Sequence, residues 1–235
     1  GHMAKQGSGE HGHPLKVMET AILVDGGFYL KRARSLFGSM TPKKRADELE
    51  NYCKKHINKF DDRHLYRVFY YDCPPSGAVI WNPVTQKNVP LAKTNLYSWT
   101  KDFHEELAHR RKFALRMGEL LDTHGGYTLK KDSLKKLLVG KKTLNDLTDD
   151  DLDLNIRQKG VDMKLGLDIA SLAYGGIVNQ IIMIAGDSDF VPAAKMARRQ
   201  GIDFILDPMW SHITSSLNLH IDGLETCCKK PSPKN

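Results

Sequence analysis

The sequence predicts a three-layer α/β domain with a mainly parallel central sheet. Short apolar runs recur along the chain, and each suits a strand that is covered on both faces. Most of these runs are separated by segments in which apolar residues recur every three or four positions, as they do in helices. Strands that alternate with helices in this way usually pair side by side in a parallel sheet. The chain has 235 residues, which fits one large domain with an insertion.

The N-terminal half supplies the first expected strands and helices. The strands are rich in apolar, aromatic and β-branched residues, and they cover residues 20–25, 64–71 and 112–117. The helices are expected at residues 28–37, 43–58 and 96–110. Gly38 ends the first of these helices, and Pro42 stands at the start of the second, where its fixed φ and missing N–H are tolerated.

The alternation returns in the C-terminal half after an interruption. Strands are expected at residues 180–185 and 203–206, and helices at residues 161–173 and 190–200. Residues 118–159 break the pattern, because they mix Lys-rich and Asp-rich runs, and Gly125 and Gly126 suggest a hairpin. We expect an insertion there, which would serve as a lid or a basic patch rather than as part of the sheet.

The ends of the chain and its composition set the domain limits. We expect residues 1–17 to be a disordered tail with an expression-tag scar, residues 18–225 to be the domain, and residues 226–235 to be a C-terminal tail. The four cysteines form no CxxC pair, so neither a zinc site nor a disulfide framework is expected. No apolar run approaches the roughly 20 residues that a membrane span needs. We therefore expect a cytoplasmic protein without membrane contact.

The chain is basic, with 35 Lys and Arg residues against 28 Asp and Glu residues and a net charge of +7. This balance fits an ordinary basic domain, and it equally fits a domain that binds a polyanion such as nucleic acid. Charge alone does not separate the two.

Aspartates stand at the ends of the expected elements. Asp25 closes the first strand, and Asp187 and Asp189 lie in the turn after a later strand. Asp162 stands at the start of a helix. Because the carboxyl ends of parallel strands meet at one edge of a sheet, where ligands bind, we expect these four side chains to lie close together.

Carboxylates gathered in this way repel one another unless a cation neutralises them. Oxygen ligands without His or Cys favour Mg²⁺ or Mn²⁺ over zinc, and such an ion can activate water to attack a phosphodiester. The candidate metal-binding and catalytic residues are therefore Asp25, Asp162, Asp187 and Asp189. Each of them could instead cap a helix or a turn, as could Ser188.

Three segments resemble the signature blocks of the NYN domain family: residues 22–30 (ILVDGGFYL), 159–168 (KGVDMKLGLD) and 186–190 (GDSDF). The similarity is to the LabA-like bacterial branch of this family, which is related to the PIN-domain nucleases. It covers roughly residues 20–209. The resemblance implies a Rossmann-like (PIN-like) sheet and divalent-metal-dependent endonucleolytic cleavage of RNA, with the four aspartates as the metal ligands.

Other residues near the expected site receive supporting roles. Asp168 lies about 120° around the helix from Asp162, so we expect it to stand behind the metal ligands or to be structural. Ser188 could contact a metal-bound water or the scissile phosphate. Basic residues near the same edge are candidates for contacts to the RNA backbone: Lys31, Arg32, Lys159, Lys164 and Lys195.

Two other α/β enzyme classes are disfavoured by single positions. A haloacid-dehalogenase-like phosphatase needs a second Asp two residues after the first, where Gly27 stands, and another Asp four residues after Asp187, where Val191 stands. A dinucleotide-binding fold needs a GxGxxG motif after the first strand, and none is present.

The stronger alternative is a non-catalytic RNA-binding or regulatory module on the same fold. Many NYN domains have Asn three residues after the first Asp, whereas this chain has Phe28, and the change removes an amide that could orient water or phosphate. The four acids argue for a metal, because a pure binder of polyanions gains nothing from clustered negative charge. A DNA-specific or structure-specific nuclease also stays open, as does a homodimer.

Overall fold

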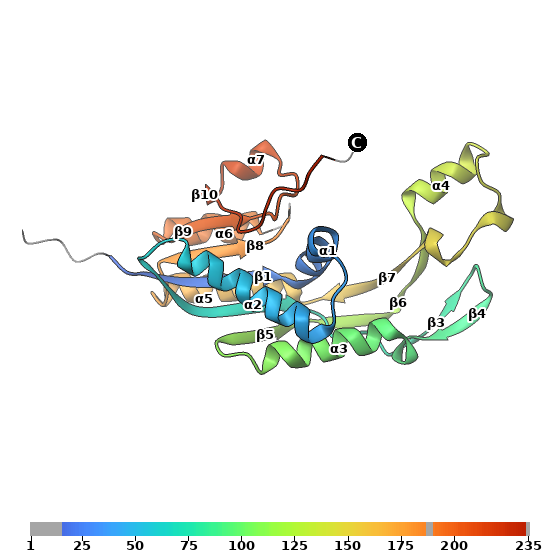
Figure 1. Ribbon diagram of the computed structural model, residues 1–235, viewed down its shortest axis with the longest axis horizontal. Coiled ribbons are helices and arrows are strands. Elements are labelled where there is room, and N and C mark those ends of the chain that lie inside the picture. The colour runs from blue at the N-terminus through green and yellow to red at the C-terminus, as the bar shows by residue number, and fades with distance from the viewer. Residues whose placement is uncertain (1–15, 187–189, 234–235) are drawn as a thin grey trace, which may run out of the picture.

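The computed structural model describes residues 16–186 and 190–233 (Figure 1). Its centre is a six-stranded sheet with the order β10-β9-β8-β1-β2-β5. Every neighbouring pair of strands in this sheet is parallel. The α/β class and the parallel sheet expected from the sequence are confirmed, and the topology is compatible with a PIN-like fold. The strands are β1 (Met18–Asp25), β2 (Arg63–Asp72), β5 (Phe113–Met117), β8 (Gln180–Ile184), β9 (Asp203–Asp207) and β10 (Gly223–Leu224).

Helices cover both faces of the sheet and make the structure three-layered (Figure 1). Ile22 and Val24 pack against the helices of one face, and Leu23 packs against those of the other. Since β1 is buried on both sides, its run of apolar residues needs no alternation. One face carries α1 (Gly26–Phe37), α2 (Pro42–Asn58) and α3 (Asn95–Ala108), and the other carries α5 (Val161–Tyr174), α6 (Val191–Arg199) and α7 (Ser215–Asn218).

Most observed elements lie within a few residues of the expected ones. The first helix begins at Gly26 instead of Phe28, because Asp25 itself caps it. An antiparallel hairpin of β3 (Val79–Asn82) and β4 (Lys87–Pro90), followed by the 3-10 turn η1 (Leu91–Lys93), was not predicted. Among the described residues, no helix has both the length and the apolar character to cross a membrane.

Residues 118–159 stand apart from the central sheet. They contain an antiparallel pair, β6 (Glu119–Leu129) and β7 (Leu152–Lys159), which reaches to one side of the molecule (Figure 1). Between the two strands lie α4 (Lys131–Leu138) and the 3-10 turns η2 (Leu144–Asp146) and η3 (Asp149–Asp151).

The hairpin expected at Gly125 and Gly126 is confirmed as an antiparallel pair, but the chain does not reverse at these glycines, because both lie inside β6. A Cβ atom on Gly125 would lie 2.5 Å from the carbonyl oxygen of Asn155. Glycine is needed there for the close approach of β7, not for a reversal of the chain.

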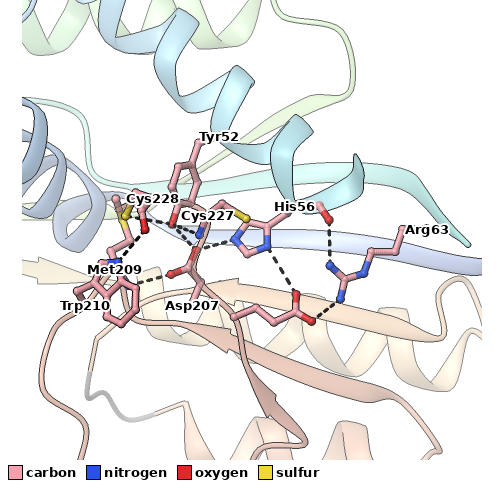
Figure 2. Close-up of polar contacts among 9 residues, drawn as sticks. Tyr52, His56, Arg63, Asp207, Met209, Trp210, Cys227 and Cys228 are labelled. Carbon is pink, nitrogen blue, oxygen red and sulfur yellow. Dashed lines mark hydrogen bonds and ion pairs between the residues drawn. The ribbon is translucent and has the colours of Figure 1, made fainter. Parts of the chain in front are cut away.

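A buried polar network surrounds Asp207 at the end of β9 (Figure 2). Its carboxylate accepts hydrogen bonds from the Tyr52 hydroxyl at 2.5 Å and from the Met209 N–H at 2.8 Å. The His56 Nε2 atom lies 2.6 Å from the same carboxylate. Asp207 and His56 are fully buried, so the network replaces part of the water that these side chains lose on folding, although the buried Nδ1 atom of His56 has no hydrogen-bond partner among the described residues.

The same network holds the C-terminal segment, residues 225–233, against α2 (Figure 2). Glu225 accepts a 2.8 Å charge-assisted hydrogen bond from Arg63. Further along, the Cys227 N–H donates to the Tyr52 hydroxyl at 3.3 Å, and the Trp210 indole N–H donates to the Cys228 carbonyl at 2.9 Å. The described part of the expected C-terminal tail is therefore fastened to the domain.

Candidate active site

The chain changes direction across the sheet beside β1. From β1 it proceeds to β2 and β5 on one side, and it later returns to β8, β9 and β10 on the other. Ligands of open α/β sheets bind at such a switch point, beyond the carboxyl ends of the strands. Val24 of β1 pairs with Ile184 of β8, so Asp25 and Gly186 emerge from neighbouring strands. Asp187, Ser188 and Asp189 follow Gly186 and lie outside the described residues.

A pocket of about 370 Å³ lies at this edge. It brings Asp25 together with Asp162, although these residues are far apart in the sequence. A larger groove of about 1760 Å³ lies between α1, α2 and the C-terminal segment, but neither aspartate lines it. The smaller pocket is lined by Asp25, Tyr71, Gln158, Gly160, Val161, Asp162, Leu165, Gly166, Phe190, Pro192 and Ala193.

Asp25 is held at the N-terminus of α1, where its carboxylate accepts a 3.3 Å hydrogen bond from the Phe28 N–H. Its pKa is raised above the ordinary value, because burial disfavours the charged form and because Asp72 and Asp162 repel it. The hydrogen bond from Phe28 acts in the opposite direction. Asp25 thus carries a carboxylate in a place where negative charge is already present.

Glycines at this edge allow close packing around Asp25. A Cβ atom on Gly26 would lie 2.5 Å from the Tyr71 carbonyl oxygen, so α1 can start directly against the end of β2. A Cβ atom on Gly186 would lie 2.9 Å from the Phe28 ring. Phe28 therefore packs over the residue that precedes Asp187.

Asp162 is the second residue of α5 and is exposed at the pocket. Gly160 precedes the helix with φ 88°, a left-handed conformation that glycine adopts without strain. The positive end of the helix dipole favours a carboxylate in the first turn. Local structure thus accounts for the position of Asp162, and both Asp162 and Asp25 line the pocket.

Asp168 is engaged in contacts to the sheet. Its carboxylate accepts two hydrogen bonds from the Arg116 guanidinium, at 2.9 and 3.1 Å, and one from the Tyr71 hydroxyl at 2.7 Å. Burial, followed by this hydrogen bond to Asp168, raises the pKa of Tyr71. Since Tyr71 lines the pocket, Asp168 ties α5 and the pocket wall to β2 and β5.

Asp72 is an acidic residue near the site that the sequence analysis did not select. It ends β2, as Asp25 ends the neighbouring β1, and its charge contributes to the raised pKa of Asp25. Its carboxylate already accepts hydrogen bonds from the Tyr70 hydroxyl at 3.2 Å and the Cys73 N–H at 2.8 Å, and it lies 3.1 Å from His104 Nε2. The strand-end rule that selected Asp25 would also have found Asp72.

The basic candidates are distributed unequally around this edge. Lys159 ends β7 beside two pocket residues, and Lys164 lies one turn into α5. Lys31 is exposed on α1, whereas the Arg32 guanidinium donates to the Met209 carbonyl at 3.1 Å. Lys195 lines a separate hollow on α6 that contains none of the pocket aspartates. The structure therefore does not bring all five together.

The donor set at the pocket fits a hard divalent cation. Within residues 16–186 and 190–233, no three His, Cys, Asp or Glu side chains are clustered closely enough to hold a metal by themselves. Mg²⁺, however, is commonly bound by only one or two carboxylates and completes its shell with water and phosphate oxygens. Asp25 and Asp162 meet that requirement, and Asp25 already experiences the repulsion that a cation would relieve.

Comparison with known proteins gives one family match. Residues 101–217 match the model of the NYN domain, a range that includes Asp162 and residues 187–189 but not Asp25. No curated protein matches the chain. A crystal structure of a protein of unknown function from Vibrio parahaemolyticus RIMD 2210633 is similar, with 14% identity and a TM-score of 0.45, over 90% of this chain and 94% of that one. The chain thus contains a region that matches the NYN domain, whose family is nuclease-like and PIN-related.

Proposed function

We propose that this protein is a divalent-metal-dependent endoribonuclease of the LabA-like branch of the NYN family, and that the pocket at the end of β1 and the start of α5 is its active site. The main support is that Asp25 and Asp162 line one pocket at the switch point of the sheet. Residues 187–189 directly precede Phe190, which also lines this pocket. The NYN match over residues 101–217 supports a nuclease independently of that geometry.

In this proposal Asp25, Asp162, Asp187 and Asp189 hold Mg²⁺ or Mn²⁺. When bound, the cation supplies Lewis acidity and a water activated for attack on the phosphodiester. The protein holds the two described carboxylates on separate elements, one at a strand end and one at a helix start. Lys159 directly precedes the pocket residue Gly160, and Lys164 directly precedes the pocket residue Leu165, so in this proposal they contact the phosphates on either side of the scissile bond.

The purified full chain is expected to cleave RNA internally in the presence of Mn²⁺ or Mg²⁺ and to lose this activity in EDTA. The measurement is gel analysis of single-stranded and hairpin RNA, labelled at either end, beside DNA of the same sequences. Internal products from RNA alone support an endoribonuclease. Equal cleavage of DNA would contradict the RNA preference, and cleavage that persists in EDTA would contradict the metal.

The second candidate is a non-catalytic RNA-binding module, and Phe28 is the observation that favours it. Its ring lies against Gly186, where an Asn side chain would offer an amide close to the acids. Tight RNA binding without cleavage, under every metal condition and at high protein concentration, would favour this function over the nuclease.

Asp168→Asn is expected to lower cleavage roughly tenfold while the fold is retained, since residues that orient metal ligands commonly contribute about ten- to a hundredfold. The substitution weakens the paired contact to Arg116 but leaves an oxygen for the Tyr71 hydroxyl. If Asp168 positions the pocket, the variant should need more Mn²⁺ for half-maximal cleavage. An unchanged metal requirement, with only a lower melting temperature, would mean that Asp168 is purely structural.

A further inference from the structure

The arm, defined as residues 119–159, begins and ends at the candidate active site. Gln158 and Gly160, at its returning end, line the pocket. Gly118 directly precedes the arm, and a Cβ atom on it would lie 2.6 Å from a methyl carbon of Val161. The beginning of the arm therefore packs tightly on the start of α5. The position of the arm is therefore tied to the helix that carries Asp162.

The far end of the arm is well separated from the pocket. Figure 1 shows β6 and β7 leading away from the six-stranded sheet, with α4 at their distal end. β6 has an irregular stretch between Leu121 and Gly126, so the length of the pair is set by the 8 residues of β7; at about 3.3 Å per residue the arm extends for about 26 Å. We call residues 130–151, which join the two strands, the tip.

Three carboxylates of the tip accept hydrogen bonds from other residues. Asp151 accepts hydrogen bonds from the Lys142 ammonium and the Ser133 hydroxyl, both at 2.7 Å. Asp146 accepts a 2.8 Å hydrogen bond from the backbone N–H at the start of its own turn, and Asp149 accepts one of 2.8 Å from an Asn side chain of β3. Of these three acids only Asp151 is buried, whereas Asp146 and Asp149 are exposed.

The lysines of the tip are presented to solvent. Lys130, Lys131, Lys135 and Lys141 are exposed on α4 and the turns beside it. Lys136 is also exposed, in a 3.1 Å surface pair with Asp132 that water screens. Because α4 and the residue before it carry four lysines against one acid, Asp132, this part of the tip is positive, although the formal charges of the whole tip nearly balance.

We propose that the tip is a second contact for the phosphodiester backbone of a polynucleotide whose cleavage site lies in the pocket. The proposal rests on the proposed nuclease function, and it adds a length requirement. With one base pair per about 3.4 Å of B-form helix axis, a substrate must span about eight base pairs to touch both places. Substrates shorter than this reach only the pocket and its neighbouring lysines.

The test measures binding in EDTA, so that it does not depend on cleavage. RNA duplexes of about 6 and about 24 base pairs, and DNA duplexes of the same sequences, are titrated with the full chain at salt concentrations from about 50 to 200 mM. The tip variant carries Lys131→Ala, Lys135→Ala and Lys141→Ala. A matched control carries three substitutions of exposed lysines on α2, after it and on α3: Lys54→Ala, Lys59→Ala and Lys101→Ala.

We expect wild-type protein to bind the long duplex more tightly than the short one and with a steeper salt dependence. For the long duplex, the tip variant should reduce the steepness of the plot of log binding constant against log salt concentration by about three, roughly one for each lost phosphate contact. The short duplex should bind the tip variant as it binds the wild type. The control should match wild type on both. Stronger binding of RNA or of DNA would show which polynucleotide supplies the backbone, and either result supports the tip contact.

Three outcomes would overturn this role of the tip. The first is an unchanged slope for the long duplex, and the second is an equal loss for both lengths. The third is a wild-type dimer in sedimentation that the tip variant breaks, since exposed Leu138 and Leu144 would then belong to a protein interface. Length-dependent binding without any cleavage would refute the nuclease and leave the tip contact standing, whereas cleavage with length-independent binding would do the reverse.

Discussion

Asp25→Asn is expected to lower metal-dependent cleavage by at least about a hundredfold without unfolding the protein. The asparagine has nearly the same volume and can still accept the hydrogen bond from the Phe28 N–H, because Asn and Asp are equally good N-caps. What it loses is the negative charge in the pocket that Asp162 also lines. Residues that only support a metal ligand contribute about ten- to a hundredfold, so loss of a direct ligand should exceed that range. The measurement is the single-turnover cleavage rate at saturating Mn²⁺.

The same substitution should increase the stability of the metal-free protein at neutral pH. The pKa of Asp25 is raised on folding by burial and by its acidic neighbours, so the folded chain binds this proton more tightly than the unfolded chain does. Above the folded pKa the ionised carboxylate therefore destabilises the fold, and this cost disappears as the pH falls through that pKa. Asparagine never bears the cost, so its advantage should be present at about pH 7.5 and should shrink in acid.

Urea unfolding in EDTA and in Mg²⁺ separates a metal ligand from a simple helix cap. Mg²⁺ should stabilise the wild type much more than Asp25→Asn, because a ligand stabilises only the state that binds it. Asp61→Asn, on an exposed residue before β2, is the control and should behave as wild type. If Asp25→Asn keeps its cleavage rate, or if the metal stabilises both proteins equally, Asp25 is only a cap.

The central sheet could be predicted because its information is local. The buried strands β1 and β8 each contain a run of four apolar residues, and the helices between strands show their own periodicity. The arm could not be predicted in the same way. Leu152, Leu154 and Ile156 alternate as a strand would, but they follow an Asp-rich run, and their partner strand lies more than twenty residues away in the chain. Pairing over that separation leaves no signal in a single sequence.

The residues of the candidate site were likewise predictable only in part. Asp25 and Asp162 could be selected because strand ends and helix starts converge in any parallel sheet. Helix geometry predicts that Asp168 lies on another face of α5 than Asp162, and the hydrogen bond from Arg116 to Asp168 agrees with this position. Asp72 was passed over, although it follows the same rule. The network around Asp207 was beyond prediction, because His56, Asp207 and Glu225 meet only through the tertiary fold.

Asp207→Ala is expected to destabilise the protein by about 3 to 5 kcal/mol, because each buried donor left without an acceptor costs about 1 to 3 kcal/mol. Asp207 is fully buried, and its loss leaves the Tyr52 hydroxyl and His56 Nε2 without the acceptor that compensates for their burial. The measurement is the free energy of urea unfolding. Asp132→Ala, which breaks an exposed pair with Lys136, is the control and should cost no more than about 0.5 kcal/mol.

A second measurement connects this network with the C-terminal segment. Burial, and next the charge of Asp207, raise the pKa of Cys227 to about 11, so at about pH 8 its thiol is almost entirely protonated and should alkylate slowly. Asp207→Ala should speed this alkylation for two reasons. The substitution removes the negative charge that opposes thiolate formation. It also removes the partner that holds the Tyr52 hydroxyl near the Cys227 N–H. A small loss of stability with unchanged alkylation would mean that the segment is held by its apolar contacts alone. A large loss together with fast alkylation would mean that one buried carboxylate fastens the end of the chain to the sheet.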